Sequence, residues 1–480
     1  MPLQLTKLKL DRELPVPLAR QLYVQMHQQI MQGQVVYAER LPASRDLANT
    51  LNLSRGVVVD CYEMLRIDGL VVGLGKRGTQ VCYQQAAPVL AKRRRRALDL
   101  SARGNNIAQA RHYEQASLLR LTPGLPDLSL FPHQQWLSLS REAWQQTQGI
   151  YQREGGLKEL KLSLRNFLVQ YRGIQIEDLS CLLITTCSQG ALSLLANLLT
   201  DAGELAVLEQ PGWTGAEGAL RQAGLHLHHI PLDTEGALVP QGIRAKLAVL
   251  TPNAQYPTGA VMSMQRREAW LQYSQAHAVW LIEDDYAAEY SYQQHPTPSL
   301  LTHPNAEQVI HIGTMSKLML PDLRLGWMVV PKCIAASVCA SINTLGLQPA
   351  YSLQQQLALF IHYGYLGEHL ARTRAIYNER RRLCTEYLQQ HGADLLNIIP
   401  SVSGMNSLVQ IKHSMDFAKL NTALKLAGFG CMLYKMRCPD TDKPDIYLVL
   451  GHALVGESSL ELTLSQLLTV LRHLSGTQAT

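Results

Sequence analysis

The chain has 480 residues, of which 46% are hydrophobic, so it is long enough for two or three domains and can bury a large core. Its net charge of +6 is small for this length and excludes a uniformly basic or acidic protein, although residues 92–96 form an unbroken basic run. Such a run is as often a solvated linker as a phosphate-binding segment.

The nine cysteines form neither Cys-x-x-Cys pairs nor clusters with histidine at metal-ligand spacing. This pattern predicts no metal site and favours a reducing compartment over a disulfide framework. The amino terminus is charged where a signal peptide would be apolar, and no apolar window is long enough to span a bilayer. We therefore expect a cytoplasmic protein with no membrane partner.

The first eighty residues predict three helices and a hairpin. Residues 18–30 carry apolar side chains in steps of four, which predicts an amphipathic helix ending at Gly33. Two short helices follow, which we expect Ser44 and Ser54 to cap, with a turn between them. Residues 70–72 and 79–82 predict a hairpin with basic residues at its tip. A small protein-binding domain is the alternative, but helix-turn-helix followed by a basic hairpin favours DNA binding.

The motifs Leu-Pro-Ala-Ser-Arg-Asp-Leu-Ala (41–48) and Ser-Arg-x-x-Val-x-x-Cys-Tyr-x-x-Leu (54–65) precede a hairpin whose glycine-rich turn ends in Gly-Thr (78–79). Together they resemble the winged helix of GntR-type bacterial regulators over residues 17–83. The resemblance implies that residues 1–83 bind double-stranded DNA. The residues it places near DNA are Arg45, Ser54, Arg55, Lys76, Arg77 and Thr79. We expect Arg55 to recognise a base, because arginine can bind guanine bidentately, and the other cations to hold phosphates.

Residues 84–115 show no sustained periodicity and contain Pro88 and the basic run. They predict a flexible linker to a larger domain over residues 116–480. The basic run would add nonspecific affinity for DNA.

The larger domain alternates short apolar runs with helical patterns, for example at 188–199 and 264–276. The strand candidates are residues 182–185, 205–209, 227–232, 247–250, 279–283, 309–312 and 327–330. This alternation predicts an α/β fold with a mainly parallel sheet covered by helices on both faces. Ligands of such sheets bind in the loops at the strand ends.

Several of these loops suit pyridoxal 5′-phosphate (PLP), an aldehyde with a phosphate group. Residues 186–191 open a helix, whose free amides can bind phosphate, although an ordinary helix cap is the alternative. Trp213 could stack on a flat ring or lie in the core. A carboxylate in 283–285 can hold a pyridine nitrogen protonated. Lys317 follows a hydroxyl-rich turn, and Arg324 follows seven residues later.

Thr-Pro-Gly-Leu-Pro-Asp-Leu-Ser-Leu-Phe-Pro (122–132), Glu-Asp-Asp-Tyr (283–286) and Gly-Thr-Met-Ser-Lys-Leu-Met-Leu-Pro-Asp-Leu-Arg-Leu-Gly (313–326) carry a second resemblance. Residues 121–474 resemble fold-type I PLP-dependent enzymes, the aspartate aminotransferase superfamily. A GntR-like winged helix joined to such a domain resembles the MocR subfamily of bacterial transcriptional regulators.

The second resemblance implies a role for each matching residue. Lys317 would form an imine with the PLP aldehyde, and Asp284, with Asp285 one residue away as the alternative, would pair with the pyridine nitrogen. Tyr286 would bind the phenolic oxygen and Trp213 would stack on the ring. The residues implied to bind phosphate are Ser188, Gln189, Thr314, Ser316 and Arg324, with Tyr151 reaching the phosphate of a neighbouring subunit.

Four departures from the patterns of the regulators and the aminotransferases weaken the case for efficient transamination. Cys187 stands where a glycine is usual in the phosphate loop, Ala254 replaces a histidine usual in the regulators, and Tyr256 replaces the asparagine of aminotransferases. Residues 447–452 contain no arginine to anchor a substrate carboxylate, and Arg437 lies in a nearby loop without an assigned role.

The sequence thus predicts a homodimeric transcriptional regulator, not an enzyme, that senses PLP or its aldimine with an amine or amino acid. No residue is assigned a catalytic role. The alternatives are a working aminotransferase with an added DNA-binding domain and a DNA-binding protein with an inert dimerisation domain.

Overall fold

The computed structural model describes residues 8–84, 100–101, 104–105, 119–146, 154–293, 297–437 and 444–476. The chain divides into two compact units, residues 1–98 and 99–480. Within the described ranges, no helix has the length and apolarity needed to cross a membrane.

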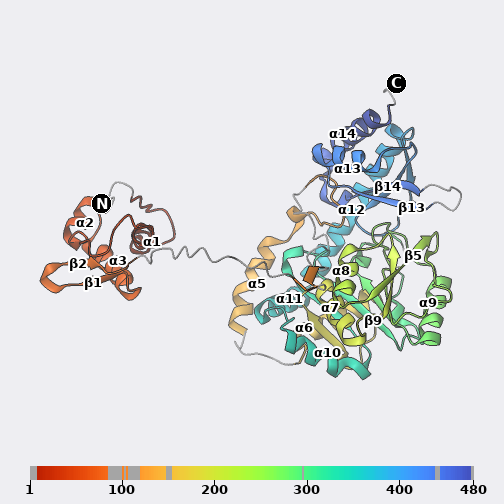
Figure 1. The fold of residues 1–480 in the computed structure, drawn as a ribbon, viewed down its shortest axis with the longest axis horizontal. Coiled ribbons are helices and arrows are strands. Elements are labelled where there is room, and N and C mark those ends of the chain that lie inside the picture. The colour runs from red at the N-terminus through yellow and green to blue at the C-terminus, as the bar shows by residue number, and fades with distance from the viewer. Residues whose placement is uncertain are drawn as a thin grey trace. The chain divides into compact units, whose positions relative to one another are not determined.

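The amino-terminal unit is a three-helix domain with a two-stranded hairpin (Figure 1). Its elements are α1 (Leu18–Met31), α2 (Ser44–Leu51), α3 (Arg55–Ile67), β1 (Val71–Gly73) and β2 (Thr79–Val81). The predicted apolar ridge of α1 is buried at Leu22, Met26 and Ile30. The strands pair antiparallel, with Val71 opposite Val81, and a 3-10 turn over Gly75–Arg77 forms the tip.

One of the two predicted helix caps is wrong. Ser54 caps α3, because its hydroxyl accepts a hydrogen bond from the amide of Val57 at 3.4 Å. Ser44 is instead the first residue of α2, and Ala43 occupies the cap position without a side-chain bond. The hydroxyl of Ser44 accepts a 3.4 Å hydrogen bond from Nε of Arg55, so it contacts the next helix.

The second unit is built on an eight-stranded sheet in the order β3-β10-β9-β8-β7-β4-β5-β6. The strands are β3 (Leu182–Thr185), β4 (Leu205–Gln210), β5 (His226–Asp233), β6 (Gly236–Ala237), β7 (Leu247–Leu250), β8 (Trp280–Asp285), β9 (Val309–Thr314) and β10 (Gly326–Val329). Strands β9, β8, β7, β4 and β5 are parallel, which confirms the mainly parallel sheet. Strand β10 is antiparallel to both β3 and β9, so β3 and β9 run in the same direction.

Helices cover both faces of this sheet, as the alternating pattern predicted (Figure 1). The helices on the two faces are α6 (Lys158–Arg172), α7 (Ser188–Leu199), α8 (Thr214–Gln222), α9 (Met264–His277), α10 (Lys332–Leu345) and α11 (Tyr351–His362). Apolar residues of α7, α8 and α10 share one core with Ile282 and Ile310. The neighbouring residues Leu281 and Val309 point to the opposite face and pack with α9.

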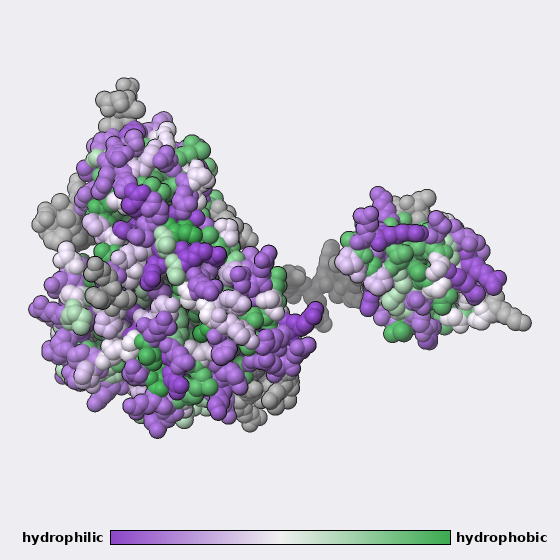
Figure 2. Space-filling model, turned by 180° about the vertical axis from the view of Figure 1, so that it is seen from behind, coloured by the Kyte–Doolittle hydropathy of each residue, from purple (hydrophilic) through white to green (hydrophobic). Residues whose placement is uncertain are grey.

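A smaller antiparallel sheet with its own helices follows. Its strands are β11 (Leu396–Ile399), β12 (Ser407–Ile411), β13 (Met432–Arg437) and β14 (Pro444–Leu450), in the order β11-β12-β14-β13. The remaining helices are α5 (His133–Gln146), α12 (Tyr365–His391), α13 (Phe417–Leu426) and α14 (Glu457–Ser475). Hydrophilic side chains prevail on the face of this unit seen in Figure 2, with small apolar patches between them.

Candidate cofactor and DNA-binding sites

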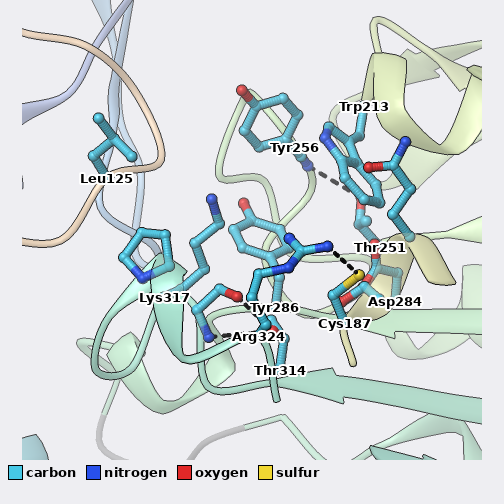
Figure 3. A pocket seen from close by; sticks show the side chains of 14 residues that line it. Leu125, Cys187, Trp213, Thr251, Tyr256, Asp284, Tyr286, Thr314, Lys317 and Arg324 are labelled. Atoms are coloured by element: carbon cyan, nitrogen blue, oxygen red, sulfur yellow. Dashed lines mark hydrogen bonds between the residues drawn. The ribbon is translucent and has the colours of Figure 1, made fainter. Parts of the chain in front are cut away.

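A cavity of about 270 Å³ lies where the carboxyl ends of β3, β4, β7, β8 and β9 meet (Figure 3). Nine of the ten residues predicted to bind the cofactor line it. They are Ser188, Gln189, Trp213, Asp284, Tyr286, Thr314, Ser316, Lys317 and Arg324. The tenth, Tyr151, lies outside the described residues. The lining also includes residues without a predicted cofactor role: Leu125, Cys187, Thr251, Tyr256 and Pro321.

The segment from Gly313 to Arg324 places a lysine and an arginine at this cavity. A side chain at position 313 would come within 2.2 Å of the indole of Trp327 on β10, so the strand requires glycine there. The hydroxyl of Thr314, the last residue of β9, accepts a hydrogen bond from the amide of Ser316 at 3.2 Å. Arg324 has a left-handed backbone, with φ +47°. These contacts turn the chain sharply between β9 and β10.

Lys317 is half-buried at the cavity, and its Nζ donates a hydrogen bond to the carbonyl oxygen of Gly124 at 2.6 Å. Burial lowers the pKa of Lys317 from 10.5 to about 8, and the charge of Asp284 opposes this shift. At neutral pH, a larger fraction of Lys317 than of an exposed lysine is therefore the neutral amine, which is the form that attacks an aldehyde.

Asp284 presents an unsatisfied carboxylate to the cavity. Within the part of the chain that the structure describes, its Oδ1 is buried and has no hydrogen-bond partner. Burial and the nearby charge of Asp285 raise the pKa of Asp284 to about 7. A protonated pyridine nitrogen would give this oxygen a donor and an opposite charge, so the carboxylate fits PLP.

Asp285 points to the other face of the sheet, because side chains alternate along a strand. It forms a buried ion pair with Nε of Arg172 at 2.6 Å, and Asn253 donates to it at 3.2 Å. Asp285, Glu283 and His311 lie within 4.8 Å of one another, close enough to hold a metal ion. However, Arg172 already supplies the compensating positive charge there. Of the two neighbouring aspartates, Asp284 is therefore the one placed to meet a cofactor.

Donors for a phosphate gather where α7 begins. Among the described residues, the amides of Ser188 and Gln189 have no hydrogen-bond acceptor, and they lie at the positive end of the helix. Arg324 lines the same end of the cavity. Its Nη2 donates a 3.0 Å hydrogen bond to the sulfur of Cys187, shown dashed in Figure 3. This cluster of donors fits a phosphate group.

Aromatic side chains enclose the rest of the cavity. Trp213 follows Gly212, where a side chain would come within 2.4 Å of the carbonyl oxygen of Glu209. Tyr286 is buried, which raises the pKa of its hydroxyl above the usual value. Tyr256 packs edge-on against Tyr286, with ring centroids 5.8 Å apart, and its hydroxyl lies 3.3 Å from Sδ of Met432. The flat space beside these rings suits an aromatic cofactor.

Tyr256, Thr251 and Leu125 were not predicted as site residues. Tyr256 was noted only as a departure from the aminotransferase pattern. Its place in the loop that follows the strand at 247–250, directly before Pro257, could have indicated that Tyr256 lines the site. Leu125 lies in the motif at 122–132 that carries the aminotransferase resemblance, but the motif gave it no role, and it reaches the cavity through contacts between distant parts of the chain.

The cavity offers little to hold a substrate carboxylate. Lys317 and Arg324 are the cationic side chains among the described residues that line it. His452, from the segment expected to carry an arginine, is buried and lies 3.0 Å from the hydroxyl of Ser407, and burial lowers its pKa to about 3. The side chain of Arg437 lies outside the described residues.

The residues predicted to bind DNA lie on α2, α3 and the hairpin. Arg45, Ser54, Arg55 and Arg77 are exposed and Thr79 is half-buried. The side chain of Lys76 lies outside the described residues. Arg55 is the first residue of α3, the second helix of the helix-turn-helix, which is the end that enters the major groove in such domains.

These two sites define a class of protein, a DNA-binding regulator built on the aminotransferase fold with PLP as its cofactor. The family model "Aminotransferase class I and II" matches residues 122–441, and the model "Bacterial regulatory proteins, gntR family" matches residues 18–81.

Relatives with both parts are named transcriptional regulators. The chain is 32% identical to the probable rhizopine catabolism regulatory protein MocR of Rhizobium meliloti, over 85% of each chain. It is 30% identical to the HTH-type transcriptional regulator TauR of Rhodobacter capsulatus, over 92% of this chain and 94% of TauR. The pyridoxine biosynthesis regulator PdxR of Corynebacterium glutamicum is 27% identical over 78% of this chain and 79% of PdxR. The chain belongs to the MocR-type branch of the GntR family of regulators.

Solved aminotransferases share the fold of the second unit. The kynurenine aminotransferase of Pyrococcus horikoshii superposes with a TM-score of 0.67 at 23% identity, over 80% of this chain and 96% of its own. LysN, the α-aminoadipate aminotransferase of Thermus thermophilus, superposes with a TM-score of 0.69 at 21% identity, over 78% of this chain and 98% of LysN.

Proposed function

We propose that this regulator senses PLP, alone or together with a primary amine, and that occupancy of the Lys317 cavity changes its affinity for operator DNA. The observation that carries this proposal is a half-buried lysine, Lys317, in the same cavity as a buried aspartate, Asp284, whose Oδ1 has no hydrogen-bond partner among the described residues, in a chain with a winged helix. Covalent capture of an aldehyde uses the first group, and recognition of a pyridine ring uses the second.

When bound, PLP supplies an aldehyde that condenses with an amine and a ring that withdraws electrons. The protein's own groups have separate tasks. Lys317 presents a neutral amine, and Asp284 holds a proton on the ring nitrogen. Arg324 and the first amides of α7 bind the phosphate, and Trp213 and Tyr286 confine the ring.

A ligand can change DNA binding only if it prefers one arrangement of the protein over another. We infer that the second unit pairs as a homodimer, so that two winged helices bind two half-sites of an operator. PLP, or PLP with an amine, would then favour one spacing of the two winged helices. If that spacing matches the half-sites, the ligand increases operator affinity, and if it does not, the ligand decreases it.

Aminotransferase activity is the second candidate, and the shared fold favours it. The lining of the cavity argues against it, because Arg324 is committed to the phosphate and Lys317 to the aldehyde. Among the described residues that line the cavity, no further cation is then left for a substrate carboxylate, and an unpaired carboxylate removed from water costs free energy. We therefore expect steady-state transamination with amino-acid and keto-acid pairs to be negligible.

The test is operator binding with and without PLP, measured by fluorescence anisotropy on the wild type, Lys317→Ala and Lys332→Ala. Lys332 is the control, because its side chain is 80% exposed on α10. PLP should change the operator affinity of the wild type and the control but not of Lys317→Ala. An equal response in Lys317→Ala would refute the role of the cavity, and no response in any protein would refute PLP sensing. A panel of amines, each added with PLP, then identifies a co-effector.

A further inference from the structure

The phosphate end of the cavity contains an internal hydrogen-bond acceptor, the thiol of Cys187. Its sulfur accepts one hydrogen bond from Nη2 of Arg324 at 3.0 Å and another from the amide of Gly190 at 3.3 Å. Arg324 is one of the donors assigned to the phosphate, and Gly190 follows Ser188 and Gln189, whose amides are the others, in the first turn of α7. Cys187 is 6% exposed and caps α7.

We propose that Cys187 is an affinity-determining residue, whose sulfur competes with the phosphate of PLP for Arg324 and the first turn of α7. This inference rests on the proposed function. PLP must break the contacts of the sulfur before its phosphate can use the same donors, so the cysteine weakens PLP binding without contacting the aldehyde or the ring nitrogen.

The backbone conformation does not require a particular residue at this position. Its φ of 178° is extended, a conformation open to any residue. The usual residue of the family pattern at this position, glycine, has no side chain that could compete.

The expected effect follows from the kind of bond that is lost. A hydrogen bond from a guanidinium to a neutral acceptor corresponds to about a tenfold change in an equilibrium constant. An enzyme gains from a cofactor that stays bound, whereas a sensor must release its ligand when the ligand becomes scarce. A tenfold weaker affinity moves the response to higher PLP concentrations.

The test compares two ligands that differ only in the phosphate, PLP and pyridoxal. Each is titrated by absorbance into the wild type, Cys187→Ala, Cys187→Gly and Cys333→Ala, whose altered cysteine is exposed on α10. Both Cys187 variants should bind PLP about tenfold more tightly than the wild type, with unchanged affinity for pyridoxal. Cys333→Ala should match the wild type for both ligands.

Three results would overturn the proposal. Equal or weaker PLP binding by Cys187→Ala would show that the sulfur does not compete with the phosphate. If only Cys187→Gly bound PLP more tightly, the backbone freedom of glycine would explain the effect. If the Cys187 variants gained as much affinity for pyridoxal as for PLP, the effect would not involve the phosphate. A wild type that binds no PLP refutes the proposed function itself and is distinguishable from all three.

Discussion

The protonation state of Lys317 predicts how fast the protein captures PLP at each pH. With a pKa of about 8, about one molecule in ten carries the neutral amine at pH 7. An exposed lysine with a pKa of 10.5 would be neutral in only about one molecule in three thousand. At equal intrinsic reactivity, burial therefore accelerates capture about 300-fold at pH 7. The rate should rise about tenfold per pH unit below pH 8 and level off above it.

Stopped-flow absorbance, with PLP in excess at pH 6 to 10.5, measures this profile directly. Acetylated lysine methylamide serves as the solvent-exposed reference. In Asp284→Asn the negative charge that stabilises the lysine ammonium is removed, so the pKa of Lys317 should fall and the plateau should begin at lower pH. A wild-type rate that keeps rising to pH 10.5, as the reference does, would refute the link between burial and reactivity.

Three further predictions concern DNA binding and stability. Arg55→Ala should cost about 1–3 kcal/mol of operator affinity and less on random DNA, whereas Arg77→Ala should weaken both alike and reduce the salt dependence; an equal loss for Arg55→Ala would make that residue a phosphate contact. Arg172→Ala leaves Asp285 buried without its ion-pair partner and should lower the free energy of unfolding in urea by about 3–5 kcal/mol, so an unchanged unfolding midpoint would contradict the ion pair. Burial lowers the pKa of His369 from 6.5 to about 4, so the unfolded state binds a proton at this histidine more tightly than the folded state does. The free energy of unfolding should therefore be unaffected by this histidine above pH 6.5 and should fall by about 2–3 kcal/mol between pH 6.5 and pH 4. His369→Gln should flatten this fall, and a parallel profile in the variant would show that another group is responsible.

The elements that the sequence predicted best are those with strong local patterns. Strands β3 and β7 and helix α7 have the predicted bounds, because short apolar runs between turn residues are local signals. Ser44 was wrongly predicted as a cap, because serine also occurs within the first turn and its hydroxyl lies against Arg55 of the next helix.

The candidate site could be predicted where a motif follows a strand, and less well where distant segments meet. Lys317 and Asp284 lie in such motifs, and both line the cavity. Leu125 reaches the same cavity from a segment almost two hundred residues before Lys317, and Met432 meets Tyr256 from the smaller sheet. Such contacts depend on how the two sheets pack, which local periodicity does not encode. Likewise, the bond between Cys187 and Arg324 could not be predicted from the residue types alone.

The hydrogen bond from Lys317 to Gly124 connects the cavity to the beginning of the second unit. As a free amine or ammonium, Lys317 can donate its proton to this carbonyl, but a nitrogen joined to an aldehyde carbon keeps at most one proton. Gly124 is held on its other side by Asn406, whose Oδ1 accepts from its amide at 2.9 Å. Residues 119–125 begin the first described stretch of the second unit that is longer than two residues. Capture of the cofactor is therefore expected to weaken the contact between Lys317 and Gly124, because the aldehyde and this carbonyl oxygen compete for one amino group.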